Sequence, residues 1–277
     1  MPPAMKPRGE VTRGTTAPNR LRRVDRWITA TQTGPLRTGG RPLAVDLGYG
    51  ASPVTTFELY TRLRAVAPRL EVVGIEIEPE RVAAGHALLA ALNEPGRGYE
   101  GLSFRRGGFE LPVPRPPALV RAFNVLRQYD EQAAWHAWDD LRARLAPSGV
   151  LVEGTCDEIG RRAVWVTLTK DGPQSITFAA HLRSLERPSV LAERLPKTLI
   201  HRNVPGEPVH ALLTAFDRCW ATAAPLSAFG PRARWVEAVS LLAQTHPVLT
   251  RPPYGGRNRW RLGEVTLPWT AVAPAHG

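Results

Sequence analysis

The amino-acid sequence predicts an α/β protein with a doubly wound, mostly parallel β-sheet, and three observations carry this prediction. Short apolar runs alternate with stretches of helical periodicity from Leu43 to about residue 155. Gly48 and Gly50 follow the first run, where glycines let the backbone of an open parallel sheet approach a ligand closely. Acidic residues, Asp46 and Glu76, stand at the ends of the first and second runs.

The predicted elements follow one another in strand and helix order. Strand one is the run Leu43–Leu47, and strand two is Glu71–Ile77, before Pro79, a residue that suits the first position of a helix. Helical faces repeat every three or four residues between the strands, as in Trp135, Trp138, Leu141 and Leu145. Three further parallel strands are predicted at Leu102–Arg105, Ala118–Phe123 and Val150–Gly154.

The alternation of strands and helices ends after Thr155. Residues 161–182 read as two strands joined by the turn "KDGPQ", which predicts an antiparallel hairpin at the edge of the sheet. We therefore expect three regions: a basic, flexible N-terminal tail over residues 1–34 with one short helix near Leu21–Ile28, a ligand-binding domain over residues 35–185, and a mainly helical C-terminal appendage over residues 186–277 with one late strand at Glu264–Trp269.

The composition is that of a soluble globular protein. A chain of 277 residues with 43% hydrophobic and 22% charged residues can bury one core, or a core and a smaller appendage. The only two cysteines, Cys156 and Cys219, exclude a disulfide framework and indicate no structural metal site. No run of about 18 apolar residues suggests a membrane span. We expect a cytoplasmic protein with no membrane partner.

The net charge of +11 is a weaker signal than its size suggests. Such a charge ordinarily points to a polyanionic partner. Here 33 of the 36 basic residues are arginine, in a chain rich in alanine, proline and glycine, which is what a GC-rich coding sequence produces without selection for binding. RNA or another anionic partner therefore stays open.

The loop after the first strand favours a cationic ligand. A carboxylate at Asp46 would repel a pyrophosphate at the N-terminus of the next helix, and it would attract a ligand with an ammonium and a sulfonium. S-adenosylmethionine has that charge pattern. At this loop, Asp46-Leu-Gly48-Tyr-Gly50-Ala-Ser52, the sequence resembles the Rossmann-like class I S-adenosylmethionine-dependent methyltransferases, with Ser52 in place of their third glycine.

The resemblance covers residues 43 to about 155 and implies a set of cofactor contacts. In "VVGIEIEPERV", Glu76 has the place of the family's acid that accepts hydrogen bonds from both ribose hydroxyls. The family often reads the adenine amino group with an acid or amide after its third strand, where "RRGGFELP" has Phe109 nearest the expected position and Glu110 beside it. The implied cofactor-binding residues are Asp46, Gly48, Tyr49, Gly50, Glu76, Ile77, Gly108, Phe109 and Asn124.

Candidates for the methyl-transfer site follow the fourth and fifth strands. Asn124, Arg127 and Tyr129 lie in "FNVLRQY", a loose match to a segment of several small-molecule and protein methyltransferases. Cys156 stands where RNA cytosine-5 methyltransferases carry a nucleophilic cysteine, but their Pro-Cys after the fourth strand is missing here. The catalytic candidates are thus Tyr129, Arg127 and Cys156, and no metal is required for methyl transfer.

Three function classes remain open from the sequence. The first is a methyltransferase for an unidentified acceptor. The second is a nicotinamide-dependent dehydrogenase, disfavoured because Asp46 repels phosphate and Pro53 replaces the glycine that allows close helix packing. The third is a non-catalytic RNA-binding protein on a degenerate methyltransferase scaffold, suggested by the basic N-terminus and by residues 251–269, where arginines alternate with aromatic residues.

Overall fold

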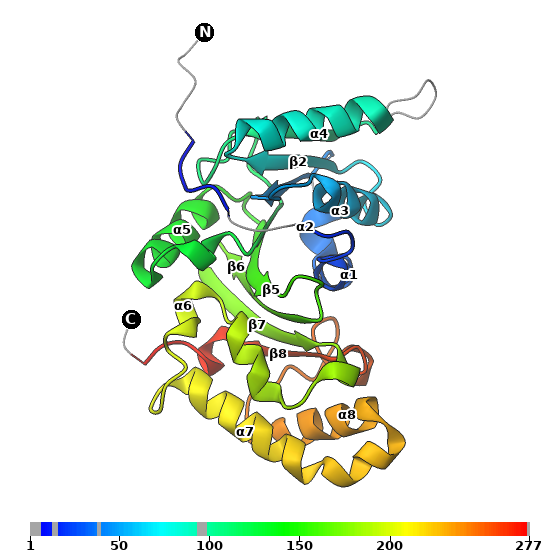
Figure 1. Cartoon of the computed structure of the whole chain (residues 1–277), viewed down its shortest axis with the longest axis vertical. Coiled ribbons are helices and arrows are strands. Elements are labelled where there is room, and N and C mark those ends of the chain that lie inside the picture. Colours follow the sequence, from blue (N-terminus) through cyan, green and yellow to red (C-terminus); the bar gives the residue numbers. More distant parts are fainter. Residues whose placement is uncertain (1–6, 13–15, 38–39, 93–98, 276–277) are drawn as a thin grey trace.

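An eight-stranded sheet runs through the whole molecule in the order β3-β2-β1-β4-β5-β6-β7-β8 (Figure 1). The structure is a computed structural model that describes residues 7–12, 16–37, 40–92 and 99–275. Strands β1 to β5 pair in parallel, and β6, β7 and β8 continue the sheet antiparallel. The strands are β1 Leu43–Leu47, β2 Glu71–Glu76, β3 Leu102–Arg106, β4 Leu119–Phe123, β5 Val150–Cys156, β6 Arg162–Thr169, β7 Gly172–Ala180 and β8 Glu264–Pro268.

The predicted fold class is confirmed by this topology. Parallel strands covered on both faces read as continuous apolar runs, which is why β1, β2, β4 and β5 are visible in the sequence. The antiparallel hairpin β6–β7 lies beside β5 as expected, and β8 adds a further antiparallel strand outside it. The helices are α1 Arg22–Thr31, α2 Thr33–Arg37, α3 Val54–Arg64, α4 Pro79–Leu92, α5 Glu131–Ala143, α6 Lys197–Ile200, α7 Pro208–Thr222, α8 Pro231–Leu242 and α9 Arg257–Trp260.

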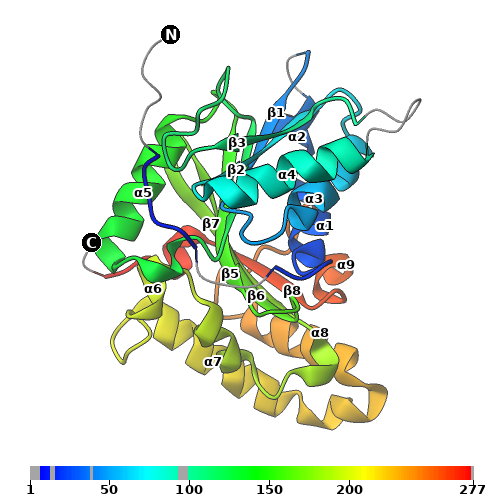
Figure 2. The ribbon, with the colours of Figure 1, turned by 45° about the horizontal axis from the view of Figure 1, so that its top comes forward.

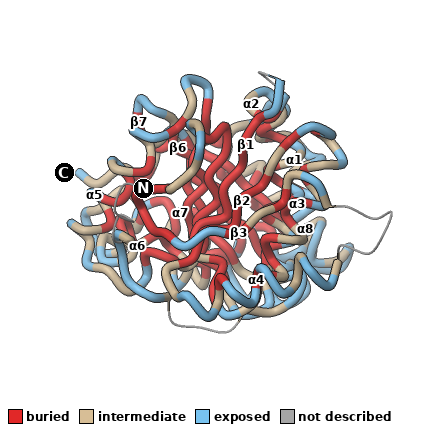
Figure 3. The backbone as a smooth tube through the Cα atoms, turned by 90° about the horizontal axis from the view of Figure 1, so that it is seen from above, coloured by how far each residue is buried: buried red, intermediate tan, exposed pale blue. Residues whose placement is uncertain are grey.

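Helices lie on both faces of the sheet (Figure 2), and a hydrophobic cluster fills the space on each face. Successive residues of a strand point to opposite faces, so Val45 joins the cluster of α5, α7 and α8, whereas Ala44 joins the cluster of α1 and α3. Asp46, one pleat further on, therefore faces the side of α1 and α3. Figure 3 shows the buried residues following the strands through the centre of the molecule.

The described residues 16–34 depart from the prediction of a flexible tail, whereas residues 1–6 and 13–15 of that predicted tail lie outside the described residues. Helix α1 buries Val24, Trp27 and Ile28, which share one helix face, at no more than 1% exposure. The Trp27 ring stands edge-on against Trp165 of β6, with 5.4 Å between ring centroids. One face of α1 thus belongs to the core, because apolar residues at helical spacing bury a stripe even in a strongly basic segment.

The C-terminal region shares the core of the predicted ligand-binding domain. Helices α7 and α8 each bury one face, with residues such as Phe216 and Trp235, in the same cluster as β5 to β8. The predicted late strand forms as β8 and pairs with β7. Residues 186–277 are mainly helical, as expected, but they also complete the sheet. Among the described residues, no helix is long and apolar enough to cross a membrane.

Short 3-10 helices complete the chain. They connect the larger elements at the carboxyl end of β4 and throughout the C-terminal region. Their bounds are η1 Leu126–Gln128, η2 Leu182–Ser184, η3 Pro188–Arg194, η4 Ala224–Phe229 and η5 Trp269–Ala271.

Candidate functional site

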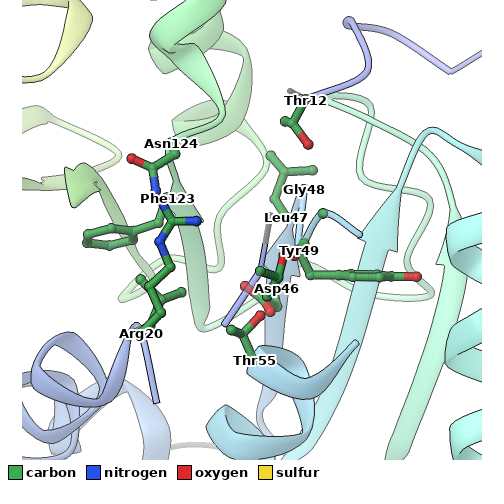
Figure 4. A pocket seen from close by; sticks show the side chains of 12 residues that line it. Thr12, Arg20, Asp46, Leu47, Gly48, Tyr49, Thr55, Phe123 and Asn124 are labelled. Atoms are coloured by element: carbon green, nitrogen blue, oxygen red, sulfur yellow. Dashed lines mark hydrogen bonds between the residues drawn. The ribbon is translucent and has the colours of Figure 1, made fainter. Parts of the chain in front are cut away.

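Two small cavities adjoin one another at the carboxyl ends of strands β1 to β4. The first has a volume of about 60 Å³ and is lined by Asp46, Gly48, Gly50, Asn124 and residues of the N-terminal region. Figure 4 shows Arg20, Phe123 and Asn124 on one of its walls and Asp46, Tyr49 and Thr55 on another. The second, of about 10 Å³, is lined by the other predicted cofactor residues Glu76, Ile77, Gly108 and Phe109, together with Tyr129.

The glycine loop between β1 and α3 turns back toward the end of β2. Gly48 and Gly50 have φ angles of 65° and 82°, in the left-handed region that favours glycine. The Gly48 N–H donates to the Ile75 carbonyl at 2.8 Å, and the Gly50 N–H donates to Glu76 Oε2 at 2.9 Å. Both glycine N–H groups therefore donate to residues at the end of β2 and are not directed at a phosphate.

Glu76 is held at the centre of this edge. Its side chain is 1% exposed, and its Oε1 accepts a 2.9 Å hydrogen bond from the Ile77 N–H. Arg81 Nη1 lies 3.5 Å from Glu76 Oε2 and supplies a positive charge. These contacts fix the carboxylate at the end of β2, the position that the sequence assigns to a ribose-binding acid.

Asp46 is paired within the protein, which changes the electrostatic argument drawn from the sequence. Arg121 of β4, its register partner on the neighbouring strand, donates to Asp46 Oδ1 at 3.0 Å and to Oδ2 at 2.7 Å. Thr56 Oγ1 donates to Asp46 Oδ2 at 2.7 Å. The sequence analysis assumed a free negative charge at Asp46, but this carboxylate is paired with Arg121. Asp46 also lines the first cavity.

The ion pair extends to helix α1. Asp25, fully buried, accepts a short hydrogen bond from Arg121 and a 2.6 Å bond from Arg62. Burial alone would lower the pKa of Arg121, but the two carboxylates outweigh it and raise that pKa, so Arg121 stays charged. The network joins α1, β1, β4 and α3, and the sequence analysis missed it.

The loop after β3 binds the backbone N–H and carbonyl of Arg8, a residue of the N-terminal region. The Phe109 N–H donates to the Arg8 carbonyl at 2.9 Å, and Glu110 Oε2 accepts from the Arg8 N–H at 2.8 Å. Gly108 leaves room for this approach, because a Cβ there would lie 1.9 Å from the Arg8 oxygen. The Gly108 N–H in turn fixes Glu110 Oε1 at 2.9 Å. Glu110, which the sequence placed second to Phe109, is thus the side chain of this loop that binds the Arg8 backbone.

Residues 8–12, called the N-terminal segment below, continue across the second cavity. The Glu10 N–H donates to the Tyr129 hydroxyl, and Gln128 Nε2 donates to the Glu10 carbonyl at 3.1 Å. Arg81 donates to the hydroxyl and to the carbonyl of Thr12, both at 3.0 Å. The predicted cofactor edge is therefore covered by backbone and side chains of the same chain.

Two residues of the N-terminal region that line the first cavity are hydrogen-bonded to its walls. Thr16 Oγ1 donates to the Tyr49 carbonyl at 3.0 Å, and Arg20 Nε donates to the Asp157 carbonyl at 2.9 Å on the opposite wall. The Tyr49 ring itself points away from the cavity (Figure 4), and its hydroxyl donates to the Arg81 carbonyl at 2.9 Å. Of Tyr49, only backbone atoms are well placed for a ligand.

The three catalytic candidates lie in different environments. Tyr129 lines the second cavity, and burial raises the pKa of its hydroxyl, which argues against a base at neutral pH. Arg127 is exposed, lies outside both cavities and reaches the Glu193 carbonyl at 3.5 Å.

Cys156 is an unfavourable nucleophile in this structure. It is 1% exposed, and burial raises the pKa of its thiol, so little reactive thiolate forms. Its sulfur accepts from Asn124 Nδ2 at 3.4 Å, and its N–H donates to Asn124 Oδ1 at 3.0 Å. Cys156 therefore holds Asn124, a residue of the cavity wall, in its left-handed backbone conformation (φ 60°).

No protein-family model and no curated protein matches this sequence. Solved structures with partial similarity include magnesium protoporphyrin IX methyltransferase from Synechocystis PCC 6803 with bound SAH, at 17% identity and a TM-score of 0.38 over 49% of this chain and 54% of that chain. Human N-acetylserotonin methyltransferase in complex with SAM has 22% identity and a TM-score of 0.34 over 50% and 35% of the two chains. A pericyclic reaction enzyme has 17% identity and a TM-score of 0.34 over 45% and 30%. The matched part spans about half of these proteins or less, and such distant similarity fixes no activity.

Proposed function

We propose that the carboxyl edge of β1 to β4 binds S-adenosylmethionine and that the chain is a methyltransferase. The observation that carries the proposal is the pair of groups that binds the backbone N–H and carbonyl of Arg8: the Phe109 N–H, a donor, and the Glu110 carboxylate, an acceptor. Adenine presents the complementary pair on one edge, since its 6-amino group donates and the adjacent ring nitrogen accepts. The Arg8 backbone thus occupies a place whose hydrogen-bonding pattern suits adenine.

The remaining residues of the edge suit the rest of the cofactor. Glu76, at the end of β2, would accept from the ribose hydroxyls, with Ile77 beside it. The first cavity, with Arg20 on one wall and Asp46, Thr55 and Asn124 around it, would hold the amino-acid part, whose carboxylate would meet the Arg20 guanidinium. This assignment keeps the sequence-predicted residues and adds Glu110 and Arg20.

Binding of the cofactor requires the N-terminal segment to move out of the site. The two cavities measure about 60 and 10 Å³, whereas pockets for ligands of this size measure roughly 300 Å³ or more. Residues 8–12 lie between the walls that would contact the cofactor, so their hydrogen bonds compete with those of the ligand. We therefore expect the affinity for the cofactor to depend on how tightly this segment is held.

When bound, the cofactor supplies an electrophilic methyl group. The residues of the chain would align the acceptor in line with that group and exclude water from it, which accounts for much of the acceleration of such a displacement. Asn124 is the side chain best placed for orienting an acceptor, because it lines the first cavity and is fixed by Cys156. Tyr129 stays neutral and serves as a wall of the pocket.

A second function, a degenerate scaffold without cofactor, is favoured by one specific observation. The N-terminal segment satisfies the Glu110 and Phe109 groups with its own backbone, as a permanent substitute for a ligand would. The two functions differ in a measurable way, because only the first predicts that the segment can be displaced. A nicotinamide dehydrogenase has less support, since both glycine N–H groups of the loop are already used within the protein.

Isothermal titration of the wild-type chain and two Arg8 variants tests the proposal. Arg8→Pro removes the N–H that donates to Glu110, whereas Arg8→Ala keeps it, and both variants lose the ion pair of Arg8 with Asp140. We expect S-adenosylhomocysteine to bind all three proteins, about fivefold more tightly to Arg8→Pro than to Arg8→Ala, since the lost hydrogen bond is worth about 1 kcal/mol. Absence of binding in all three folded proteins, or tighter binding of NADH, would overturn the proposal.

A further inference from the structure

A concave surface much larger than the two cavities lies beside α1. Its volume is about 960 Å³, and α1, the β5–β6 turn, η2, α8 and α9 contribute its walls. Figures 1 and 2 both show α1 and α8 on the same side of the molecule, with the C-terminal residues of α9 and β8 between them in Figure 2. We call this surface the arginine groove. It shares no lining residue with either cavity of the carboxyl edge.

The groove concentrates positive charge far beyond the average of the chain. Eight arginines line it, against one carboxylate, Glu264. The whole chain has 36 basic and 25 acidic residues. Overall basicity therefore does not account for the groove, and the position of these arginines is the informative feature. That these cations are arginines and not lysines is uninformative, because nearly every cation of this chain is an arginine.

Most of these arginines make no ion pair or guanidinium hydrogen bond with the described residues. Within the described ranges, the guanidinium groups of the six exposed arginines of the groove make no ion pair and no hydrogen bond, and these residues are Arg22, Arg26, Arg161, Arg183, Arg232 and Arg261. The two less exposed arginines lie near Glu264, with Arg259 Nε 3.0 Å from its Oε2. Even there, Arg23 Nε and Arg259 Nη2 are buried without a hydrogen-bond partner among the described residues.

Apolar side chains alternate with these cations. Only five large hydrophobic residues are exposed in the described part of the chain, and three of them line the groove. These are Ile159 at 57% exposure, Phe229 at 79% and Leu262 at 50%. A groove that offers unpaired guanidinium groups and an open aromatic ring suits a ligand with both anionic groups and flat apolar faces.

We infer that the arginine groove binds single-stranded nucleic acid. Phosphates of the backbone would pair with the exposed guanidinium groups, and a base would stack on Phe229, as in binding surfaces that combine a basic groove with aromatic side chains. An acidic peptide would satisfy the charges but leave the apolar side chains exposed. A membrane surface is convex or flat toward a protein and does not fill a concave groove. The inference does not depend on the proposed methyl transfer.

Binding of a labelled oligonucleotide at several salt concentrations tests the inference. The probe is a fluorescein-labelled oligouridine of about 15 nucleotides, with oligothymidine of equal length as the second arm. For the wild-type protein we expect a slope of log Kobs against log salt of about −4, because each of the six exposed arginines would contribute about −0.7 by a phosphate contact on a single strand. Arg26→Ala/Arg261→Ala should reduce the slope by about 1.4 and weaken binding about tenfold.

A matched pair of arginines separates the groove from general charge. Arg69 and Arg218 are exposed and lie outside the groove, so Arg69→Ala/Arg218→Ala removes the same net charge elsewhere. This control should bind the probe within about twofold of the wild type. Equal weakening in both double variants would overturn the groove as the site, and so would absence of probe binding at about 50 mM salt.

Stacking on Phe229 is tested separately. Phe229→Ala should weaken oligouridine binding about tenfold, whereas Val204→Ala, at an exposed apolar residue outside the groove, should leave it unchanged. Equal binding of a duplex or of polyglutamate in competition would contradict the specificity for single strands. Titration of S-adenosylhomocysteine into Arg26→Ala/Arg261→Ala should give the wild-type affinity, so that failure of either proposal is seen independently of the other.

Discussion

Charged side chains have opposite roles at the carboxyl edge of the sheet and in the arginine groove. At the edge, Asp46, Glu76 and Glu110 are at most 3% exposed, and each accepts hydrogen bonds from the same chain. In the groove, six exposed arginines face solvent without a partner in the described part of the protein. Charge at the edge therefore organises the fold and holds the N-terminal segment, whereas charge in the groove remains available to an external ligand.

The comparison predicts that the charges of the edge matter most for stability. Arg121→Met leaves the carboxylates of Asp46 and Asp25 buried without their shared cation. We expect this substitution to lower the free energy of unfolding by about 3 to 5 kcal/mol, measured by urea denaturation, because an unpaired buried charge is costly. The control is Arg62→Met, which removes a partly exposed partner of Asp25 and should cost about 1 kcal/mol. Equal costs would mean that the buried network contributes little to folding.

A buried acid without a cation sharpens the same contrast. Glu153 of β5 is fully buried, the only described hydrogen bond of its carboxylate comes from Trp138 Nε1 at 3.1 Å, and burial raises its pKa to about 8. The folded state then holds a proton that the unfolded state releases above about pH 4.5, so its contribution to stability is complete below that pH and is lost as the pH rises to 8.

Glu153→Gln should remove this pH dependence. The free energy of unfolding of the wild type should fall relative to the variant by about 1.4 kcal/mol per pH unit between pH 5 and 8. Denaturation curves at several pH values measure the difference. Parallel pH profiles for the two proteins would show that Glu153 is ionised in the folded state and has a partner outside these contacts.

The smallest expected effect is the difference in affinity for S-adenosylhomocysteine between variants of Glu76 and Asp46, two acids of the edge. Glu76→Gln should weaken S-adenosylhomocysteine binding about tenfold, or about 1.4 kcal/mol, because Glu76 would contact the ribose. Asp46→Asn makes the same change of charge at a carboxylate that Arg121 already occupies, and it should change affinity less than twofold. Calorimetric titration gives both values. A larger effect for Asp46→Asn would restore the direct attraction to a cation that the sequence suggested.

The sequence predicted the parallel half of the sheet and the glycine loop because their signals are local. Buried strands are apolar runs, and Gly48, Gly50 and Glu76 follow such runs directly. The pairing of Asp46 with Arg121 also had a signal that was not used, since a lone arginine in the apolar run "ALVRAF" needs a buried counter-charge.

Other features left weaker signals or none. The buried face of α1 has helical spacing, but its many arginines favoured the reading of a solvated tail. The contact of Arg8 with Glu110 joins residues 102 positions apart, and no periodicity or motif marks it. The arginine groove combines elements from both halves of the chain, so only the folded structure brings its cations together.

A crystal structure of the chain with S-adenosylhomocysteine tests the central claim most directly. The account predicts adenine hydrogen-bonded to the Phe109 N–H and to the Glu110 carboxylate, with residues 8–12 moved out of the space between Glu76 and Tyr129. A ligand bound elsewhere would contradict this account. The same holds if the Arg8 N–H still donates to Glu110 at saturating ligand.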